Sequence, residues 1–392
     1  MNLSEIEPSV RIGRNVKVIA EEVELGRNVR LGDNVSIQAR RLRLADHVHI
    51  GQEVVVEADT LEIGHSTRIE ARCRLSGSGG PARLIQIGEQ TLLAHDTKLL
   101  VPVAVIGDYT DIHNHCLLYG QKSLLIGHNV WIGQNNILNA EECLTIGNNV
   151  GAGSYTSIFT HGYFGELLEG CQVFKVAPVV IEDDVWILGA YNTISPGVTL
   201  GSKSLVLNGS VVTKDVPSNH TVGGSPARDL TDRLTPYRDI SPCHKFDRIQ
   251  TFVQEFLDAK YPGDYQSLEN GFRVSGGREP FCVAFVPELV DVGSLPADRP
   301  LLVFAQTSTL TGSPKGVTVF DLTRKHYLRT RSEPEVQLLR FLKSYRARFV
   351  PADNPRVSIP QRLWADSWSG QAPAVGSAAA GDQAWPAHSC DC

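Results

Sequence analysis

A glycine recurs at a slowly drifting interval along more than half of this 392-residue chain, each time just after an aliphatic residue. A step of about three hexads separates many of the copies, and extra copies one hexad further on lie between them. The aliphatic residues that open the main copies are Ile12, Leu25, Leu44, Ile63, Ile87, Ile106, Ile126, Ile146, Ile181 and Leu200, with Ala45 and Glu182 in the glycine position of two copies. Hexapeptide repeats of this kind are a signature of parallel β-helices. Each hexad is expected to form a short strand, whose aliphatic residue points into the prism, and a turn, where Gly, Asn or Asp avoids the strain of a β-branched side chain.

Charge and hydropathy exclude two classes of partner. The net charge is −6, and no Lys/Arg run or alternation of basic and aromatic residues occurs, so we expect no nucleic-acid partner. The first residues lack a basic segment followed by an apolar one, and no stretch of about 18 apolar residues exists, so we expect no membrane partner. These features favour a cytoplasmic protein.

The eight cysteines show no paired spacing of the kind that builds zinc sites. Most are expected to be reduced thiols in the core, and no metal is expected. Cys390 and Cys392 have a spacing that allows them to bind a soft metal, but they lie in a tail expected to be flexible, so we assign them no functional role.

The repeat divides the chain. Residues 10–235 are expected to form the β-helix, interrupted by the glycine-rich segment 76–81 and by a longer stretch at about 159–179. Because each coil rests on its neighbour, extra residues must leave the wall as a loop, and loops on rigid scaffolds often carry function. The second interruption contains His161.

After Arg228 the period is lost. Residues 240–360 are expected to form a small α+β domain of unknown role with a mostly antiparallel sheet. Helical apolar spacing occurs at 246–259 and at 333–348, where the apolar positions include Tyr345. Short strands are expected at 272–274, 281–286, 301–305 and 317–322. Residues 361–392 are rich in Ala, Gly, Ser and Pro, which predicts a disordered tail.

Four ordered motifs fill residues 181–228. They read IEDDVWI from Ile181, ISPGVTLG from Ile194, GSVVTKDVP from Gly209 and VGGSPAR from Val222. This set resembles the last coils of the hexapeptide-repeat acyltransferases, in particular the galactoside, maltose and antibiotic O-acetyltransferase group. The resemblance covers about residues 10–230. It implies an all-β left-handed parallel β-helix, acetyl-CoA as acyl donor, and a homotrimer with active sites in clefts between neighbouring prisms.

The resemblance also implies a general base. In this family a histidine on an extruded loop just before the Val-Trp-Ile coil takes the acceptor's proton, and His161 occupies that position. The chemistry agrees, because an alcohol is a poor nucleophile near pH 7 and imidazole titrates close to that pH. A direct attack on the thioester then needs no acyl-enzyme cysteine.

A polar column is expected one hexad away from the loop. The fourth position of the second hexad in successive coils is Asp96, His115, Asn135 and Tyr155. Such a column suits a hydroxylated acceptor such as a sugar. The family also places an asparagine one coil below its base, for which Asn135 or Asn136 is the match and Asn139 a similar candidate. Asn also fills turn positions throughout the repeat, which is the structural alternative for these residues.

CoA contacts are carried over from the family by position. They fall on Gly189, Asn208, Thr213 and Lys214, and Arg228 adds a planar fork suited to phosphate. Two departures add bulk beside the pantetheine path: Leu188 replaces the usual Gly of Trp-Ile-Gly, and Asn208 replaces the usual Ala. Backbone N–H groups near Gly189 are expected to meet the developing oxyanion.

The predicted function is therefore CoA-dependent transfer of an acetyl group to a hydroxyl of a sugar or a glycosylated small molecule. One alternative is N-acetylation of an amino sugar, which uses the same fold and a similar base. Another is a noncatalytic β-helix scaffold that binds a partner through the C-terminal domain. A third, the zinc site of γ-class carbonic anhydrases, needs a His-Gly-Cys element, from which the sequence His-Asn-His-Cys at 113–116 departs.

Overall fold

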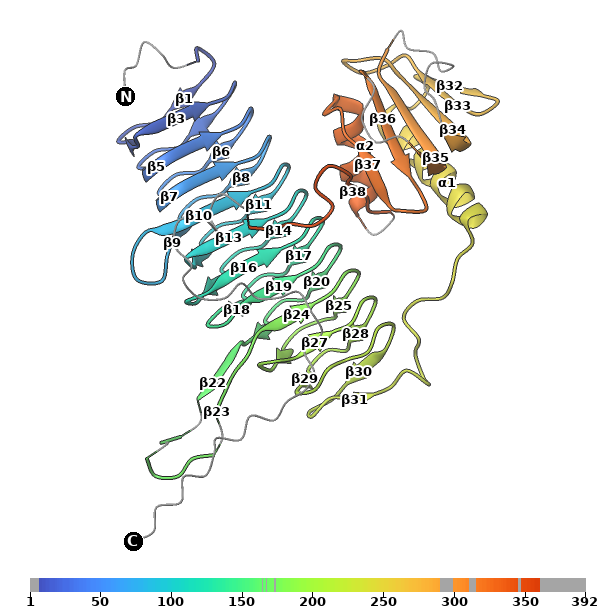
Figure 1. Ribbon diagram of the computed structural model, residues 1–392. Coiled ribbons are helices and arrows are strands. Elements are labelled where there is room, and N and C mark those ends of the chain that lie inside the picture. Colours follow the sequence, from blue (N-terminus) through green and yellow to red (C-terminus); the bar gives the residue numbers. More distant parts are fainter. Residues whose placement is uncertain are drawn as a thin grey trace. The chain divides into compact units, whose positions relative to one another are not determined.

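Figure 1 shows the computed structural model, which describes residues 7–163, 165–166, 168–172, 174–289, 299–309, 315–344 and 347–359. The predicted tail at 361–392, with Cys390 and Cys392, lies outside the described residues, and so does Tyr345. The described part consists of a stack of β-coils followed by a sheet with two helices.

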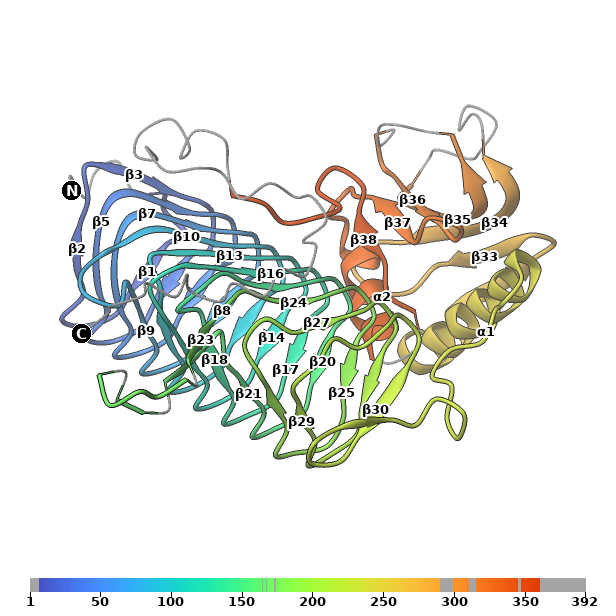
Figure 2. The ribbon, with the colours of Figure 1, turned by 60° about the horizontal axis from the view of Figure 1, so that its bottom comes forward.

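The coils have three faces, which we number in the order the chain visits them (Figures 1 and 2). Face 1 is a sheet made of β1 (Arg11–Ile12), β4 (Arg30–Leu31), β6 (His49–Ile50), β8 (Arg68–Ile69), β11 (Leu92–Leu93), β14 (Asp111–Ile112), β17 (Trp131–Ile132), β20 (Gly151–Ala152), β25 (Trp186–Ile187), β28 (Leu205–Val206) and β30 (Thr221–Gly223), with β31 (Arg228–Asp229) antiparallel at its end.

Faces 2 and 3 form one continuous sheet, because β5 (Ser36–Leu44) and β7 (Val55–Ile63) run along both. Face 2 further contains β2 (Lys17–Ile19), β9 (Arg74–Ser76), β12 (Lys98–Leu100), β15 (Leu117–Tyr119), β18 (Ile137–Asn139), β21 (Ser157–Ile158), β26 (Thr193–Ile194) and β29 (Val211–Val212). Face 3 further contains β3 (Glu22–Leu25), β10 (Ala82–Ile87), β13 (Val103–Ile106), β16 (Ser123–Ile126), β19 (Leu144–Ile146), β24 (Val179–Ile181) and β27 (Thr199–Leu200). We call the turns between faces 1 and 2 corner 1, those between faces 2 and 3 corner 2, and those between faces 3 and 1 corner 3.

The repeated aliphatic residues build the core, as predicted. Ile126, Ile132 and Leu138 mark one coil, and each is completely buried in a cluster that runs the length of the stack. The role of the repeated glycine differs from the prediction. A Cβ on Gly107 would lie 2.6 Å from the carbonyl carbon of Gly127 in the next coil, so the glycine is needed for close stacking. The left-handed turn conformation belongs instead to residues such as Asn129, which has a φ of 56°.

The C-terminal part is a seven-stranded sheet in the order β32 (Tyr265–Leu268), β33 (Gly271–Val274), β34 (Phe281–Leu289), β35 (Leu301–Ser308), β36 (Val317–Asp321), β37 (His326–Leu328) and β38 (Val350–Pro351). The sheet is mixed instead of mostly antiparallel. The pairs β32–β33, β33–β34 and β36–β37 are antiparallel, whereas β34–β35, β35–β36 and β37–β38 are parallel. The first five residues of β35 and all of β36 are buried, which is typical of parallel strands that are covered on both faces. The prediction of a β-helix followed by an α+β domain is confirmed.

Both predicted helices are present and pack on one face of this sheet. The first, α1 (Pro242–Lys260), begins at Ser241, whose hydroxyl accepts the backbone N–H of His244. The second, α2 (Glu333–Lys343), ends five residues before the predicted Arg348, because the chain then returns to form β38 beside β37. No helix within the described ranges is long and apolar enough to cross a membrane.

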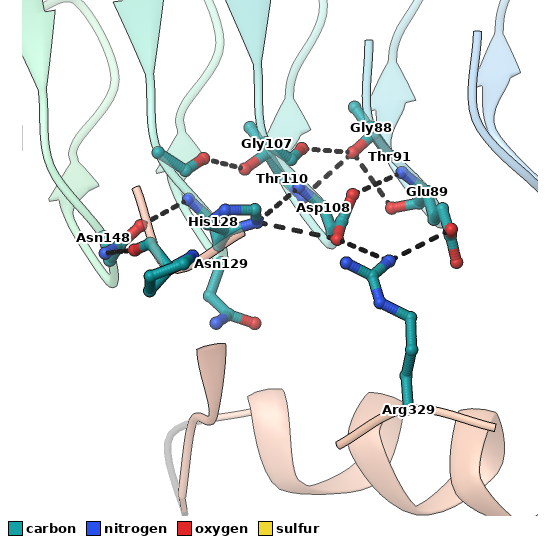
Figure 3. Close-up of polar contacts among 12 residues, drawn as sticks. Gly88, Glu89, Thr91, Gly107, Asp108, Thr110, His128, Asn129, Asn148 and Arg329 are labelled. Carbon is teal, nitrogen blue, oxygen red and sulfur yellow. Dashed lines mark hydrogen bonds and ion pairs between the residues drawn. The ribbon is translucent and has the colours of Figure 1, made fainter. Parts of the chain in front are cut away.

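The C-terminal sheet is joined to corner 3 of the middle coils by buried charges (Figure 3). Arg329, just after β37, lies 3.0 Å from a carboxylate oxygen of Glu89 and 3.2 Å from one of Asp108. The ring of Tyr109, from the same turn as Asp108, is part of the hydrophobic cluster that α1 and α2 form with the sheet. Lys343 at the end of α2 adds an ion pair of 2.6 Å with Asp111 on face 1. The two parts thus share an interface built from both apolar and ionic contacts.

Candidate active site

The chain leaves the coils at corner 2, where the repeat is interrupted. After β21 it forms an antiparallel hairpin of β22 (His161–Tyr163) and β23 (Phe174–Val176), and it returns to face 3 at β24 (Figure 1). His161 is the first residue of the hairpin, directly opposite Val176. The histidine is therefore held at the base of the hairpin, next to the wall of the prism.

A hydrogen bond to Asn139 helps to orient the imidazole of His161. Its Nδ1 lies 2.7 Å from Oδ1 of Asn139, a residue of the coil below that is completely buried. An amide oxygen only accepts hydrogen bonds, so Nδ1 must carry the proton and the lone pair lies on Nε2. The ring of Phe159 packs edge-on against the imidazole, with the centroids 6.4 Å apart. This arrangement selects the tautomer that a general base needs.

Thr160 holds the Asn139 amide in this orientation. The buried Thr160 hydroxyl accepts the backbone N–H of Glu142 at 3.0 Å and lies 2.9 Å from Asn139 Oδ1, to which it donates. The oxygen of the amide, rather than its nitrogen, therefore faces both Thr160 and His161. The sequence makes Asn139 a candidate for the acceptor site. In the structure its Oδ1 already accepts hydrogen bonds from Thr160 and His161, so Asn139 positions His161.

The predicted polar column is present at corner 1. Strand register places Leu93, Ile112, Ile132 and Ala152 side by side on face 1, so the residues three positions later are stacked as well. Those residues, Asp96, His115, Asn135 and Tyr155, all have positive φ angles between 56° and 62°. His115 Nδ1 lies 3.8 Å from a carboxylate oxygen of Asp96, which is itself paired with Arg72. The column is a partly exposed polar edge of the prism.

The column and His161 lie on opposite edges of face 2 within one chain. Asn135 stands before β18 and Asn139 is the last residue of β18, so this strand separates the column from the asparagine that contacts His161. Asn136 is completely buried, and its amide bonds the carbonyl of Gly133 and the N–H of Thr156. Asn136 therefore ties two turns together inside the prism instead of facing an acceptor.

The coil above the column has one extra residue at corner 1. Ala152 pairs with Ile187 and Ile158 with Ile194, so a span of six residues lies beside a span of seven. The Leu188 departure is thus part of an insertion rather than a simple replacement of glycine, which corrects the sequence interpretation. The longer turn places the ring of Tyr191 on that of Tyr155, with centroids 5.2 Å apart and planes at 20°. Tyr191 is 71% exposed and Tyr155 is 45% exposed.

The predicted CoA residues fall at three places near the last coils. Gly189 and Asn208 touch each other at corner 1, since a Cβ on Gly189, whose φ is 65°, would lie 2.5 Å from Asn208 Cγ. Thr213 and Lys214 are exposed at corner 2, beyond β29. Arg228 is exposed on β31. In one chain Gly189 and Asn208 lie at one edge of face 2, Thr213 and Lys214 lie at the other, and Arg228 lies at the end of the face 1 sheet.

Two residues near the site were not predicted. Tyr191 has no signal in a hexad count, because the insertion that exposes it becomes visible only in the strand register. Lys175 lies on β23, outside the hexads, and its ammonium would be 3.0 Å from a Cβ on Gly197 in the next corner-2 turn. Lys175 thus brings a cation to corner 2, next to the coil of His161 and below Lys214.

The described residues contain no group of three His, Cys, Asp or Glu side chains placed to hold a metal ion. His113 is used within face 1, where its Nε2 accepts from the indole N–H of Trp131 at 2.8 Å. Cys116 is buried, and burial raises the pKa of its thiol to about 11.

Comparison with known proteins places these features in context. No family model matches the chain. The chain is 34% identical over 124 residues to a galactoside O-acetyltransferase of Escherichia coli, covering 30% of this chain and 60% of that protein. It is 44% identical over 54 residues to a 2,3,4,5-tetrahydropyridine-2,6-dicarboxylate N-acetyltransferase of Staphylococcus aureus, covering 14% and 22%. Among solved structures, a hexapeptide-repeat acetyltransferase of Vibrio cholerae is 31% identical, with 35% of this chain and 71% of that one aligned and a TM-score of 0.18.

The chain is thus similar to hexapeptide-repeat acyltransferases, the galactoside O-acetyltransferases among them, as its motifs predicted. It spans about 60% of the length of the galactoside O-acetyltransferases that it matches.

Proposed function

We propose that this protein transfers an acetyl group from acetyl-CoA to a hydroxyl of a sugar-like acceptor, with His161 as general base. The hydrogen bond from His161 Nδ1 to Asn139 Oδ1 is the observation that carries the proposal. It leaves Nε2 as the nitrogen that can accept a proton. A side chain placed in this way contributes about 10²- to 10⁴-fold to the rate of proton transfer.

The reaction needs no covalent enzyme intermediate. His161 Nε2 takes the proton as the acceptor oxygen attacks the thioester carbonyl, the C–S bond breaks as the tetrahedral intermediate collapses, and the thiolate of CoA receives the proton. Asn139 keeps the proton on Nδ1 while the imidazolium forms. Backbone N–H groups near Gly189 would stabilise the negative charge on the carbonyl oxygen, which is often the largest single contribution.

We include a homotrimer in the proposal. Within one chain β18 separates the His161 corner from the column of His115, Asn135 and Tyr155. If corner 2 of one copy faces corner 1 of the next, a single cleft combines both sets. Lys175 and Lys214 at corner 2 would then bind CoA phosphates opposite Gly189 and Asn208 of the neighbouring copy.

The acceptor class follows from the side chains at corner 1. Tyr155 and Tyr191 form an exposed pair of aromatic rings, and Asn135 and His115 supply hydrogen-bonding groups in the coils below. Aromatic rings beside polar groups suit a sugar ring, which has an apolar face and hydroxyls at its edge. Tyr191→Ala should therefore raise the KM for the acceptor while leaving the KM for acetyl-CoA unchanged, and Tyr191→Phe should keep the wild-type value.

The first experiment replaces His161 by Ala and measures turnover of acetyl-CoA with a panel of sugars. We expect a loss of about 10²- to 10⁴-fold in kcat with an unchanged circular dichroism spectrum. His244→Ala, which changes an exposed histidine on α1, is the matched control. Unchanged turnover in the His161 variant would contradict the proposed role.

Asn139 is tested by the shape of the pH profile. Asn139→Leu removes the acceptor of the Nδ1 proton and should lower kcat and change the pH dependence of kcat/KM. Asn139→Asp keeps an acceptor at the same place and should retain more activity. If the two variants behave alike, Asn139 has only a packing role.

The shared cleft is tested by mixing two inactive variants, His161→Ala and Asn135→Ala. Reassembly of mixed trimers should restore part of the activity, because some clefts then contain both native residues. No recovery after subunit exchange, or a monomeric mass by light scattering, would overturn the trimeric site.

Transfer to an amine is the second candidate, because one relative is an N-acetyltransferase. Amino sugars in the same substrate panel distinguish the two reactions. Calorimetric titration with CoA addresses the scaffold alternative, since absence of CoA binding would favour a noncatalytic role.

A further inference from the structure

The C-terminal part contains a pocket that the proposed acetyl transfer does not use. Its volume is about 230 Å³, and it opens between α1, the turn after β36 and the segment that leads into β38. Six of its lining residues are apolar, and they form most of the wall: Ile240, Ile249, Phe252, Leu322, Ala347 and Phe349. The remaining three are Lys245, Arg248 and Lys325. The lining therefore contains three cations and no acid.

None of the three cations has an ion-pair partner in the described part of the chain. Lys245 and Arg248 lie three residues apart on α1, so their side chains share one face of that helix. The ammonium of Lys325 lies 3.9 Å from the centroid of the Phe349 ring, which attracts it without neutralising it. By contrast, Arg329, Arg331 and Lys343, elsewhere in the same domain, all have carboxylate partners. The lining of the pocket thus brings three positive charges together without a carboxylate among the lining residues.

Lys325 is the most constrained of the three. Burial is the main cause that lowers the pKa of its ammonium to about 7; Asp184 opposes the shift, and Lys245 and Arg348 add to it. Lys325 also has a φ of 59°, so its backbone adopts the left-handed conformation at this turn. A residue of this kind is costly to keep charged unless an anion comes to it.

We propose that this pocket binds a small organic anion, with a carboxylate or phosphate held by Lys245, Arg248 and Lys325 and an apolar group against Phe252, Phe349 and Ile249. The anion supplies the charge that the pocket lacks. Arg248 offers a planar fork that matches either oxyanion, and the two ammonium groups act as point charges. The apolar walls exclude ions that are hydrated on all sides. The site belongs to the C-terminal domain alone and is independent of the acetyl transfer proposed above.

The test is calorimetric titration of the full chain at pH 6.5 and low salt with hexanoate, phenyl phosphate and hexanol. Hexanoate or phenyl phosphate should bind, and hexanol should bind at least tenfold more weakly, because it has the apolar group without the charge. The stronger of the two anions identifies the preferred oxyanion. If neither anion binds, or if hexanol binds as well as both, the proposal is wrong.

Variants connect the binding to these residues. Lys245→Gln and Arg248→Gln should each weaken binding by at least tenfold, with unchanged denaturation midpoints in the absence of the anion. Arg273→Gln, an exposed arginine on β33 outside the pocket, is the matched control and should bind as the wild type does. Equal affinities for all three variants would overturn the assignment.

The pH dependence provides a second readout. Affinity for the anion should fall as the pH rises above about 7, because Lys325 then loses its proton. Lys325→Met should remove most of this dependence. Asp184 and Arg348 also act on Lys325, but both are unchanged in Lys325→Met, so any pH dependence that they cause remains in the variant. An unchanged pH dependence in Lys325→Met would exclude Lys325 from the site.

Discussion

Corner 3 carries charged residues at the same turn position in the first coils and in the middle coils, with opposite surroundings. In the first coils, Asp46 pairs at 2.7 Å with Arg27 of the preceding coil, and both remain open to solvent. In the middle coils, Asp108 is 5% exposed and is paired at 3.2 Å with Arg329, which is 221 residues away in the sequence. The same position of the repeat thus forms a surface ion pair in the first coils and a contact with the C-terminal part in the middle coils.

The difference indicates that burial, rather than the ion pair itself, determines how much this position contributes to stability. Burial raises the pKa of the Asp108 carboxyl, and the neighbouring His128 and Arg329 oppose that change. His128 Nδ1 accepts the backbone N–H of Asp108 at 2.9 Å, so this imidazole is neutral and Arg329 is the cation that neutralises the carboxylate. Removal of one partner of such a pair costs far more than removal of an exposed one.

The largest expected effect comes from Arg329→Ala. It leaves the buried Asp108 without its cation, while Glu89 keeps its ion pair with Arg331, and it should cost about 3–5 kcal/mol of unfolding free energy. Urea denaturation followed by circular dichroism measures the loss. A double variant, Arg329→Met with Asp108→Asn, should recover part of it, and a loss below about 1 kcal/mol in the single variant would show that the interface tolerates the bare charge.

The next largest effect is expected from Gly107→Ala in the same turn as Asp108. The new Cβ would lie 2.6 Å from the carbonyl carbon of Gly127, so the coils must separate, at a cost of about 1–3 kcal/mol. Gly79→Ala is the control, because no atom lies within 4 Å of its Cβ position. Equal denaturation midpoints for the two variants would contradict the stacking argument.

A smaller effect concerns pH. Burial lowers the pKa of His128 below its usual value near 6.5. As the pH falls, this imidazole therefore binds a proton in the unfolded chain before it does so in the folded chain. Stability should therefore decrease below about pH 6.5, and His128→Gln, whose side chain can still accept from Asp108, should lose less between pH 7.5 and 5.5. Denaturation midpoints at the two pH values give the slopes, and parallel slopes would refute this origin.

The smallest effect is expected from Arg27→Ala, which removes the exposed partner of Asp46. Many exposed ion pairs contribute nothing measurable, so the denaturation midpoint should stay within error of the wild type. A destabilisation comparable to that of Arg329→Ala would show that the two regions do not differ in the way their burial indicates.

Most of the β-helix could be predicted because its repeat is local. The aliphatic residue of each hexad enters one core, and the interruption before Ile181 predicted where the chain leaves the coils. The hexad count also placed Asp96, His115, Asn135 and Tyr155 in one column. Because each coil stacks on the one before, the spacing of residues in the sequence predicts which residues lie above one another in the structure.

Long-range partners could not be predicted. Asp108 and His128 occupy ordinary turn positions of the repeat, and the sequence around them does not indicate that Arg329 pairs with Asp108. The contact between Asn139 and His161 depends on the height of a hairpin base above the coil below, which a hexad count does not give. The parallel order of β34, β35 and β36 was missed because short buried strands have the same apolar pattern in either direction.

The ring of Tyr109 has a consequence for the order in which the molecule is made. It belongs to a β-helix turn, yet it fills a place in the hydrophobic cluster of the C-terminal part. During synthesis the coils emerge first and can stack as they appear. The C-terminal sheet can complete its hydrophobic cluster only after the coils have placed the Tyr109 ring at their surface. The β-helix thus acts as a template for the assembly of its own C-terminal neighbour, and the two should melt in one transition rather than two.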